Sequence, residues 1–154
     1  MTTEERKQTR ICVIHGPNLN MLGHRDKEQY GNLTLDKLNK TIRTFAAELD
    51  IEVSIYQFNS EEKIIKTLHR SRKSFQAVII NPAAYTHYSY AIRDAIELLP
   101  IPVVEVHLSN IYEREDFRHI SVTKDVCIKQ FYGKKEDSYR DALRYLHDHL
   151  DKSS

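Results

Sequence analysis

The feature that most constrains this chain is an alternation between two kinds of segment. Short apolar runs rich in β-branched residues alternate with segments whose apolar residues recur every three or four positions. Strands alternating with amphipathic helices predict βαβ units and a mostly parallel sheet, here of five strands. The expected strands are ICVIH (11–15), IEVSIYQF (51–58), AVIIN (77–81), PVVEVH (102–107) and, less clearly, DVCIKQF (125–131).

The intervening segments have the signals of helices that cover a sheet. Thr34 and Ser60 are residues that cap helix N-termini, and Ser60 is followed by two acidic residues that favour a first turn. Each segment carries one apolar stripe. The stripes are Leu35, Leu38, Ile42, Phe45, Ala46 and Leu49; Ile64, Ile65 and Leu68; Ala91, Ile92, Ala95, Ile96 and Leu99; and Tyr139, Leu143, Leu146 and Leu150.

The nearly continuous apolar run AVIIN (77–81) is typical of a strand covered on both faces. We therefore expect an α/β fold of three layers, a flavodoxin-like doubly wound five-stranded parallel sheet. No linker or repeat divides the chain, so residues 11–150 are expected to form a single catalytic domain. The polar residues 1–10, MTTEERKQTR, contain no apolar signal region and are expected to be a disordered leader.

Charge and cysteine content exclude several classes of protein. Lysine plus arginine number 23 against 22 aspartate plus glutamate, a net charge of +1, so charge alone recruits neither nucleic acid nor an anionic membrane. Cys12 and Cys127 lie in separate apolar runs without a C-x-x-C pair, so we expect no disulfide framework and no zinc site. A reducing cytoplasm fits this cysteine usage.

Polar residues gather where the expected strands end. In doubly wound sheets the ligand lies outside the carboxyl ends of the strands, so these side chains are candidates for one site. They lie after the first strand, at the end of the third and beyond it, and on and after the fourth: Asn18, Asn81, His87, Glu105, His107, Ser109 and Asn110.

Glu105 and His107 are two positions apart on an expected strand, so their side chains point to the same side. A carboxylate beside an imidazole favours the charged imidazolium and fixes its ring, as a general acid near neutral pH requires. A structural pair has the same spacing, so the spacing alone does not distinguish the two.

The polar stretch MLGHRDKEQYGN (21–32) resembles an active-site lid, since it lies between glycines and lacks the apolar periodicity of a helix. For Tyr30 to act as a base at pH 7, about 4 kcal/mol of bias toward the phenolate would be needed. Guanidinium groups of Arg25, Arg114 and Arg118 converging on the phenol would supply such a bias. An exposed loop with ordinary surface charges is the alternative.

Other chemistries lack their sequence signals. His87, Ser89 and Asp94 are the residue types of a hydrolase triad, but no G-x-S-x-G elbow is present. The stretch GPNLNMLG has neither dinucleotide-binding nor P-loop spacing. His147 and His149, two apart on the last helix, do not face each other, so we expect no metal site.

Three long blocks together resemble the signature blocks of type II 3-dehydroquinate dehydratases, in the same order and at the same intervals. The blocks are HGPNLNMLGHRDKEQYG (15–31), NPAAYTHYSYAIRDA (81–95) and PVVEVHLSNIYEREDFRH (102–119). The resemblance implies a cytoplasmic flavodoxin-like homo-dodecamer, a tetramer of trimers. It also implies loss of water from 3-dehydroquinate through an enolate to give 3-dehydroshikimate, in the shikimate pathway, without cofactor or metal.

The same resemblance implies the roles of individual residues. Tyr30, which closes the R-x-x-x-x-Y motif, would be the base, and Arg25 of that motif would activate it. His107 would be the acid and Glu105 its partner, while Asn18 would hold the water that stabilises the enolate. Asp94 would reach the site of a neighbouring subunit. The other substrate contacts would be Asn81, His87, Leu108, Ser109 and Arg118.

The chain also departs from the family's usual pattern. His15 stands where members commonly have asparagine before G-P-N, and the charged stretch 133–139 replaces a glycine-rich one. The latter change leaves open how the fifth strand and the last helix are placed and whether the dodecamer forms. Two alternatives therefore remain: a catalytically silent relative that acts as a small-acid binding or assembly module, and a lyase or proton-transfer enzyme for another cyclic hydroxy acid.

Overall fold

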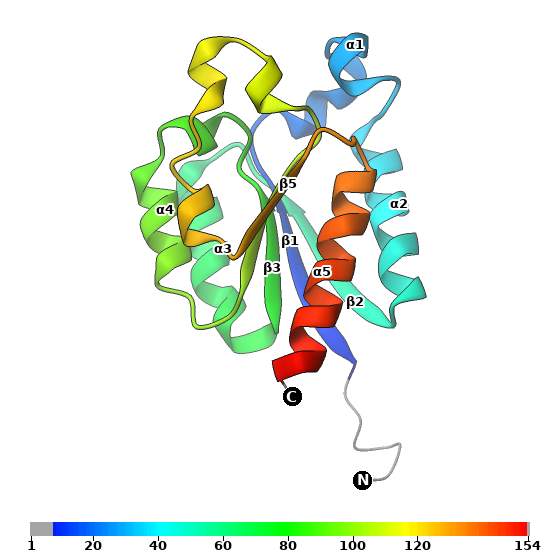
Figure 1. The fold of residues 1–154 in the computed structure, drawn as a ribbon, viewed down its shortest axis with the longest axis vertical. Coiled ribbons are helices and arrows are strands. Elements are labelled where there is room, and N and C mark those ends of the chain that lie inside the picture. The colour runs from blue at the N-terminus through cyan, green and yellow to red at the C-terminus, as the bar shows by residue number, and fades with distance from the viewer. Residues whose placement is uncertain (1–7, 154) are drawn as a thin grey trace, which may run out of the picture.

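The computed structural model describes residues 8–153, and its centre is a five-stranded parallel sheet (Figure 1). The strands are β1 (Thr9–His15), β2 (Ile51–Gln57), β3 (Ala77–Asn81), β4 (Val103–His107) and β5 (Lys129–Tyr132). Their order is β2-β1-β3-β4-β5, and every neighbouring pair is parallel. This is the flavodoxin-like doubly wound order, so the predicted fold class is confirmed.

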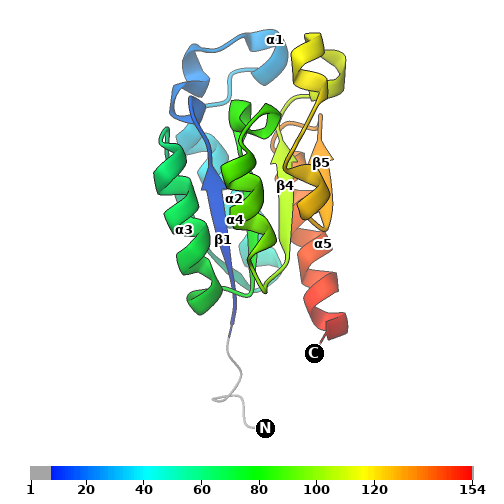
Figure 2. The same ribbon diagram turned by 90° about the vertical axis from the view of Figure 1, so that its left-hand side faces the viewer.

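Helices cover both faces of the sheet and form the outer two layers (Figures 1 and 2). On one face lie α2 (Leu35–Glu48) and α5 (Asp137–Ser153), and on the other α3 (Glu61–Ser74) and α4 (Tyr90–Glu97). None of the helices in the described part of the chain is long and apolar enough to cross a membrane.

The residues of β1 show how the sheet separates two apolar cores. Side chains of successive strand residues point to opposite faces. Ile11 and Val13 therefore join the core under α2 and α5, whereas Cys12 and Ile14 join the core under α3 and α4. All five residues of β3 are buried, as the run AVIIN predicts.

The predicted helix caps are present. The hydroxyl of Thr34 accepts a hydrogen bond from the Lys37 N–H, and that of Ser60 from the Lys63 N–H. Both residues have extended backbone angles, as N-cap residues do.

Two predicted strand boundaries differ by two residues or more in the structure, and the others by at most one. The fifth strand begins at Lys129 rather than 125, because Lys124–Val126 form a 3-10 turn and the apolar Val126 and Cys127 pack against a core outside the strand. The first strand begins at Thr9, so Thr9 and Arg10 of the predicted leader pair with β2. The first seven leader residues lie outside the described part of the chain.

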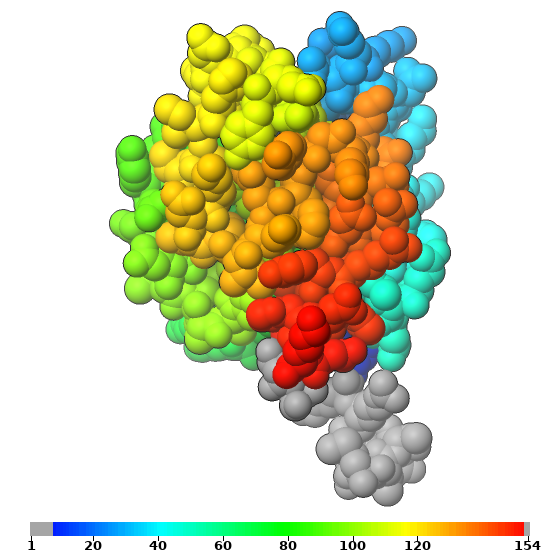
Figure 3. Space-filling view, viewed as in Figure 1, coloured from blue at the N-terminus to red at the C-terminus, as the bar shows by residue number. Residues whose placement is uncertain are grey.

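The predicted lid contains short helical segments. A 3-10 segment spans Leu19–His24, and α1 spans Lys27–Tyr30. The Asp26 side chain accepts a hydrogen bond from the Glu28 N–H and caps α1, a local signal that needs no apolar periodicity. On the face seen in Figure 3, the blue lid and the yellow segment after β4 lie next to each other at one end of the molecule.

Candidate active site

A cavity opens at the carboxyl ends of the strands, where the sequence predicts a site. Its volume is about 120 Å³, well above the roughly 10–15 Å³ that one water molecule needs. It is lined from the end of β1 by Pro17, Asn18 and Leu19, from the lid by Arg25 and Tyr30, from the end of β3 by Asn81, Ala83, Ala84 and His87, and from β4 onward by His107, Leu108, Ser109, Ile111, Arg114 and Arg118.

The cavity is positively charged. Arg25, Arg114 and Arg118 contribute guanidinium groups to its wall, and none of the described lining residues is acidic. Guanidinium groups bind carboxylates through paired, charge-assisted hydrogen bonds. The lining therefore favours a small anionic ligand.

Gly16 brings the loops after β1 and β3 together. Its N–H donates to the Asn81 carbonyl over 2.8 Å, and a Cβ at this position would lie 2.6 Å from the Pro82 carbonyl oxygen. Only glycine permits so close an approach. The contact places Asn18 and Asn81 on the same cavity, and Asn18 has a left-handed φ of 69°, which asparagine tolerates.

Glu105 and His107 form the pair that their spacing predicts. His107 Nε2 donates to Glu105 Oε2 over 2.8 Å, and both residues are buried. Burial by itself would raise the pKa of Glu105. Hydrogen bonds from His107, Thr123 and Gln130, together with the charge of His107, outweigh that effect and hold this pKa at about 2. The carboxylate is therefore ionised at neutral pH.

Tyr30 is almost fully buried and lies between two arginines. Arg114 Nη1 donates to the Tyr30 hydroxyl oxygen over 2.8 Å and also reaches Ser109 Oγ at 3.3 Å. The Arg25 guanidinium lies over the phenol ring, 4.3 Å from its centroid. The prediction placed Arg25, Arg114 and Arg118 around this phenol. In the structure Arg114 contacts the oxygen and Arg25 the ring face, whereas Arg118 bonds Glu115 instead.

His87 and Arg118 also line the cavity, and hydrogen bonds hold both side chains in place. His87 Nδ1 donates to the Ile120 carbonyl over 2.7 Å, and burial, opposed by this bond, lowers the pKa of His87. Arg118 Nε donates to Glu115 Oε2 over 3.1 Å. With these bonds made, both residues still line the cavity.

The structure brings the predicted site residues together with two exceptions. Glu105 lies behind His107, and Asp94 is exposed on α4 away from this cavity. Ser89, of the triad considered above, caps α4 and donates to Glu61. Among the described residues, no three His, Cys, Asp or Glu side chains are grouped to hold a metal ion.

Comparison with known proteins gives one family. The class II dehydroquinase family matches residues 9–147. A curated 3-dehydroquinate dehydratase of Caldanaerobacter subterraneus subsp. tengcongensis is 50% identical over 92% of this chain and 97% of its own. Among solved structures, the type II dehydroquinase of Butyrivibrio crossotus is 45% identical with a TM-score of 0.88, covering 90% of this chain and 97% of that one. The type II dehydroquinase of Propionibacterium acnes also superimposes with a TM-score of 0.88, at 38% identity, covering 94% of this chain and 99% of that one.

Proposed function

The chain belongs to the class II dehydroquinase family, and from this premise we propose how its cavity carries out the reaction. Its function is that of a 3-dehydroquinate dehydratase, a hydro-lyase that removes water from 3-dehydroquinate. The relatives give no support to the alternative of a catalytically silent binding module. The roles of single residues are our proposal.

Tyr30 is the base in this proposal. As a phenolate it takes a proton from the carbon next to the substrate carbonyl, and the carbonyl becomes an enolate. Arg114 stabilises the phenolate through its hydrogen bond to the oxygen, and Arg25 does so through its charge at the ring. Asn18, on the same cavity, holds a water molecule against the enolate oxygen.

His107 is the acid. Its Nε2–H is bonded to Glu105, so the second proton of the imidazolium, on Nδ1, is the one available to the leaving hydroxyl. The proton and the hydroxyl leave together as water, and the enolate collapses to the conjugated product. Leu108, Ser109, Asn81, His87 and Arg118 hold the substrate, and the guanidinium groups of the lining suit its carboxylate.

The observation that carries the proposal is that a tyrosine bonded to a guanidinium and a histidine bonded to a carboxylate line the same cavity. The test is to incubate the pure protein with 3-dehydroquinate and to follow the ultraviolet absorbance of the conjugated product. We expect turnover. Binding of the substrate without turnover would overturn the proposed roles and would favour the silent module.

We also propose that the chain works as a homo-dodecamer, a tetramer of trimers, in the cytoplasm and in the shikimate pathway. Support for an assembly comes from α4 and the residues just before it, where Asp94 and the aromatic rings of Tyr88 and Tyr90 are exposed. Asp94→Ala should weaken substrate binding if this side chain completes a neighbouring site. Sedimentation should show the dodecamer, and a fully active monomer would contradict it.

A further inference from the structure

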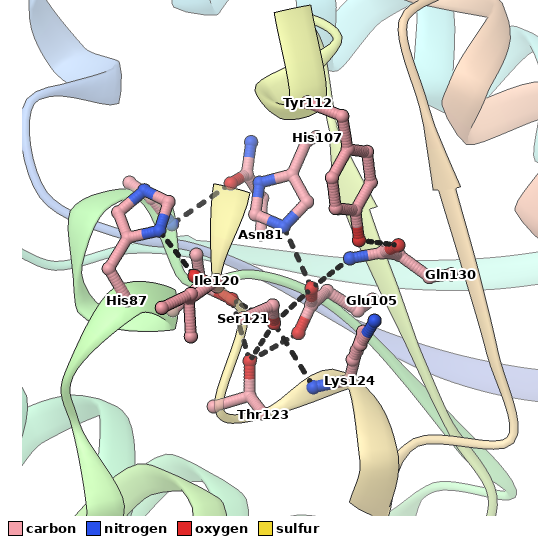
Figure 4. Close-up of polar contacts among 12 residues, drawn as sticks. Asn81, His87, Glu105, His107, Tyr112, Ile120, Ser121, Thr123, Lys124 and Gln130 are labelled. Atoms are coloured by element: carbon pink, nitrogen blue, oxygen red, sulfur yellow. Dashed lines mark hydrogen bonds and ion pairs between the residues drawn. The ribbon is translucent and has the colours of Figure 1, made fainter. Parts of the chain in front are cut away.

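Glu105 accepts four hydrogen bonds in a buried polar cluster (Figure 4). Three reach Oε2: from His107 Nε2 over 2.8 Å, from Ser121 Oγ over 2.9 Å and from Gln130 Nε2 over 2.7 Å. The hydroxyl of Thr123 donates to Oε1. No arginine or lysine of the described residues is paired with this carboxylate. The charge of Glu105 is thus balanced by His107 and by three neutral donors.

Two separate parts of the fold bring these donors to the carboxylate. Gln130 of β5 is the register partner of Glu105 on β4, so the sheet itself sets the amide beside the carboxylate. Ser121 and Thr123 are two apart on the segment before the Lys124–Val126 turn. That segment is held at Val122, whose N–H donates to the Thr86 carbonyl and whose carbonyl accepts from Arg93, each over 2.7 Å.

A second layer of contacts orients the donors. The Tyr112 hydroxyl donates to Gln130 Oε1 over 2.8 Å, which leaves the amide NH₂ of Gln130 to face Glu105. Ser121 Oγ accepts from the Lys124 N–H over 3.1 Å, which leaves its own proton for the carboxylate. The Thr86 hydroxyl lies 2.7 Å from both the Ser121 and the Thr123 oxygens and does not contact Glu105.

We propose that Ser121, Thr123 and Gln130 are positioning residues of the dehydration, which hold Glu105 ionised and in one orientation so that His107 remains an imidazolium. This inference rests on the proposed function of His107. Because Glu105 is buried, its protonated form is favoured unless donors replace the lost water. Without them the Nε2 proton of His107 moves toward Glu105 Oε2. The neutral pair that results has no imidazolium with which to protonate the leaving hydroxyl.

Thr123→Val tests the positioning role, because it replaces one hydroxyl by a methyl group of similar size. At neutral pH we expect kcat about tenfold lower, because the still ionised Glu105 then orients His107 less well, and KM within about twofold, since Thr123 does not line the cavity. Thr123→Ser restores the hydroxyl and should restore kcat. Thr86→Val is the matched control, as it makes the same change in a fully buried residue one hydrogen bond farther from Glu105. Equal losses in Thr86→Val and Thr123→Val, or no recovery in Thr123→Ser, would reduce the cluster to a structural role and overturn the proposal.

The ionisation of Glu105 should also change the pH dependence of kcat. Loss of one hydrogen bond to a charged group raises a carboxyl pKa by about one to two pH units. In Ser121→Ala/Thr123→Val the kcat profile should therefore gain an acid limb with a midpoint near pH ~4–6, which the unchanged protein lacks. The other titratable groups near the carboxylate are His107, His87, Tyr112, Cys127 and Lys124, and the double variant leaves all five in place.

Infrared spectra of protein with ¹³C-labelled glutamate, compared with those of Glu105→Gln, report the carboxylate and carboxylic acid bands of Glu105 directly. We expect the acid band of the double variant to appear at a pH at least about two units higher than in the unchanged protein. If the double variant does not fold, Thr123→Val should show a rise of about one to two units. An unmoved band overturns the inference even if the enzyme is active. An inactive unchanged protein with a moved band would instead refute the proposed function alone.

Discussion

Two histidine–tyrosine sets lie near the carboxyl-terminal edge of the same sheet and have different neighbours. In the cavity, His107 is bonded to the Glu105 carboxylate and Tyr30 to the Arg114 guanidinium. A polar atom of each side chain is therefore hydrogen-bonded to a charged group, the Glu105 carboxylate or the Arg114 guanidinium. A charge beside a titratable ring favours the oppositely charged form of such a ring.

The second set, His15 and Tyr139, is buried and has only neutral partners. The Tyr139 hydroxyl donates to His15 Nδ1 over 3.1 Å, and His15 Nε2–H donates to Asn39 Oδ1 over 2.9 Å. Burial lowers the pKa of His15 to about 4, although the Asn39 bond opposes the change, and burial raises the pKa of Tyr139. Both rings are thus held neutral at pH 7. The two sets contain the same residue types and differ in the charge beside them.

The largest expected effect is the loss of His107. His107→Ala should lower kcat by about 10²- to 10⁴-fold, or about 3–5 kcal/mol of barrier, because a positioned acid contributes that much. His15→Asn removes the other buried histidine and should keep kcat at pH 7 within about threefold. Steady-state assays of both variants, with circular dichroism to show folding, check the contrast. A His15→Asn variant as slow as His107→Ala would erase the distinction between the two sets.

Tyr30→Phe should have an effect of the same order. It deletes the base but keeps the ring under Arg25, so folding should be unchanged while kcat falls about 10²- to 10⁴-fold. Tyr139→Phe is the matched change in the second set. It should lower the free energy of unfolding by about 1 kcal/mol and leave kcat within about threefold. If folded Tyr30→Phe kept more than about a tenth of the rate, Tyr30 would not be the base.

The second set, His15 and Tyr139, should affect how the free energy of unfolding depends on pH. His15 has a pKa of about 4 in the folded protein against 6.5 as the reference value, so above pH 6.5 both states are neutral and its contribution is complete. As the pH falls from 6.5 to 4 the unfolded chain binds a proton that the folded protein excludes, which costs about 3 kcal/mol. Glu105 adds a loss only below its reference pKa of 4.5.

Urea unfolding at pH 7, 5.5 and 4.5 measures this loss. His15→Asn cannot take up that proton, so its unfolding free energy should change less over the same range. A parallel pH dependence in both proteins would mean that His15 is protonated in the folded state.

Changing an arginine beside Tyr30 to lysine should have an intermediate effect on kcat. A lysine at position 114 or 25 keeps the charge but loses the planar group that bonds the phenol oxygen or covers its ring. We expect kcat about 10- to 100-fold lower in each variant. Near-normal turnover in Arg25→Lys would remove Arg25 from the activation of Tyr30.

Chelation should have the smallest effect. The charges beside His107 and Tyr30 are protein groups, so incubation with EDTA followed by dialysis should leave kcat unchanged. Activity that is lost and then restored only by an added metal would show that the protein groups beside His107 and Tyr30 do not suffice for the reaction.

Short-range patterns in the sequence predicted much of the fold and one contact of the site. The apolar alternation gave the strands, Thr34 and Ser60 marked helix starts, and the two-residue spacing of Glu105 and His107 predicted their contact. Each of these follows from a local backbone period or from a cap. The start of the fifth strand was wrong because Val126 and Cys127 are apolar for core packing and not for pairing.

Contacts between distant segments were the part that no spacing revealed. Arg114 and Tyr30 are 84 positions apart. The sequence named Arg114 only as one of three arginines that could converge on the phenol, and which of them bonds the oxygen depends on how the lid meets the segment after β4. The alternation Ser121, Val122, Thr123 does signal two polar side chains on one side. Their shared partner, Glu105, becomes visible only when the segment is placed over β4.

The register between β4 and β5 limits how this enzyme can change. Glu105 is paired with Gln130, and β5 is a four-residue edge strand. A slip of one residue would turn Gln130 to the opposite face of the sheet. Insertions or deletions between β4 and β5 that shift this register should therefore yield proteins that fold but have lost the acid, whereas changes of length beyond β5 leave the pairing intact. The connection between β4 and β5 should therefore keep both the strand register and the residues that line the cavity or bond Glu105.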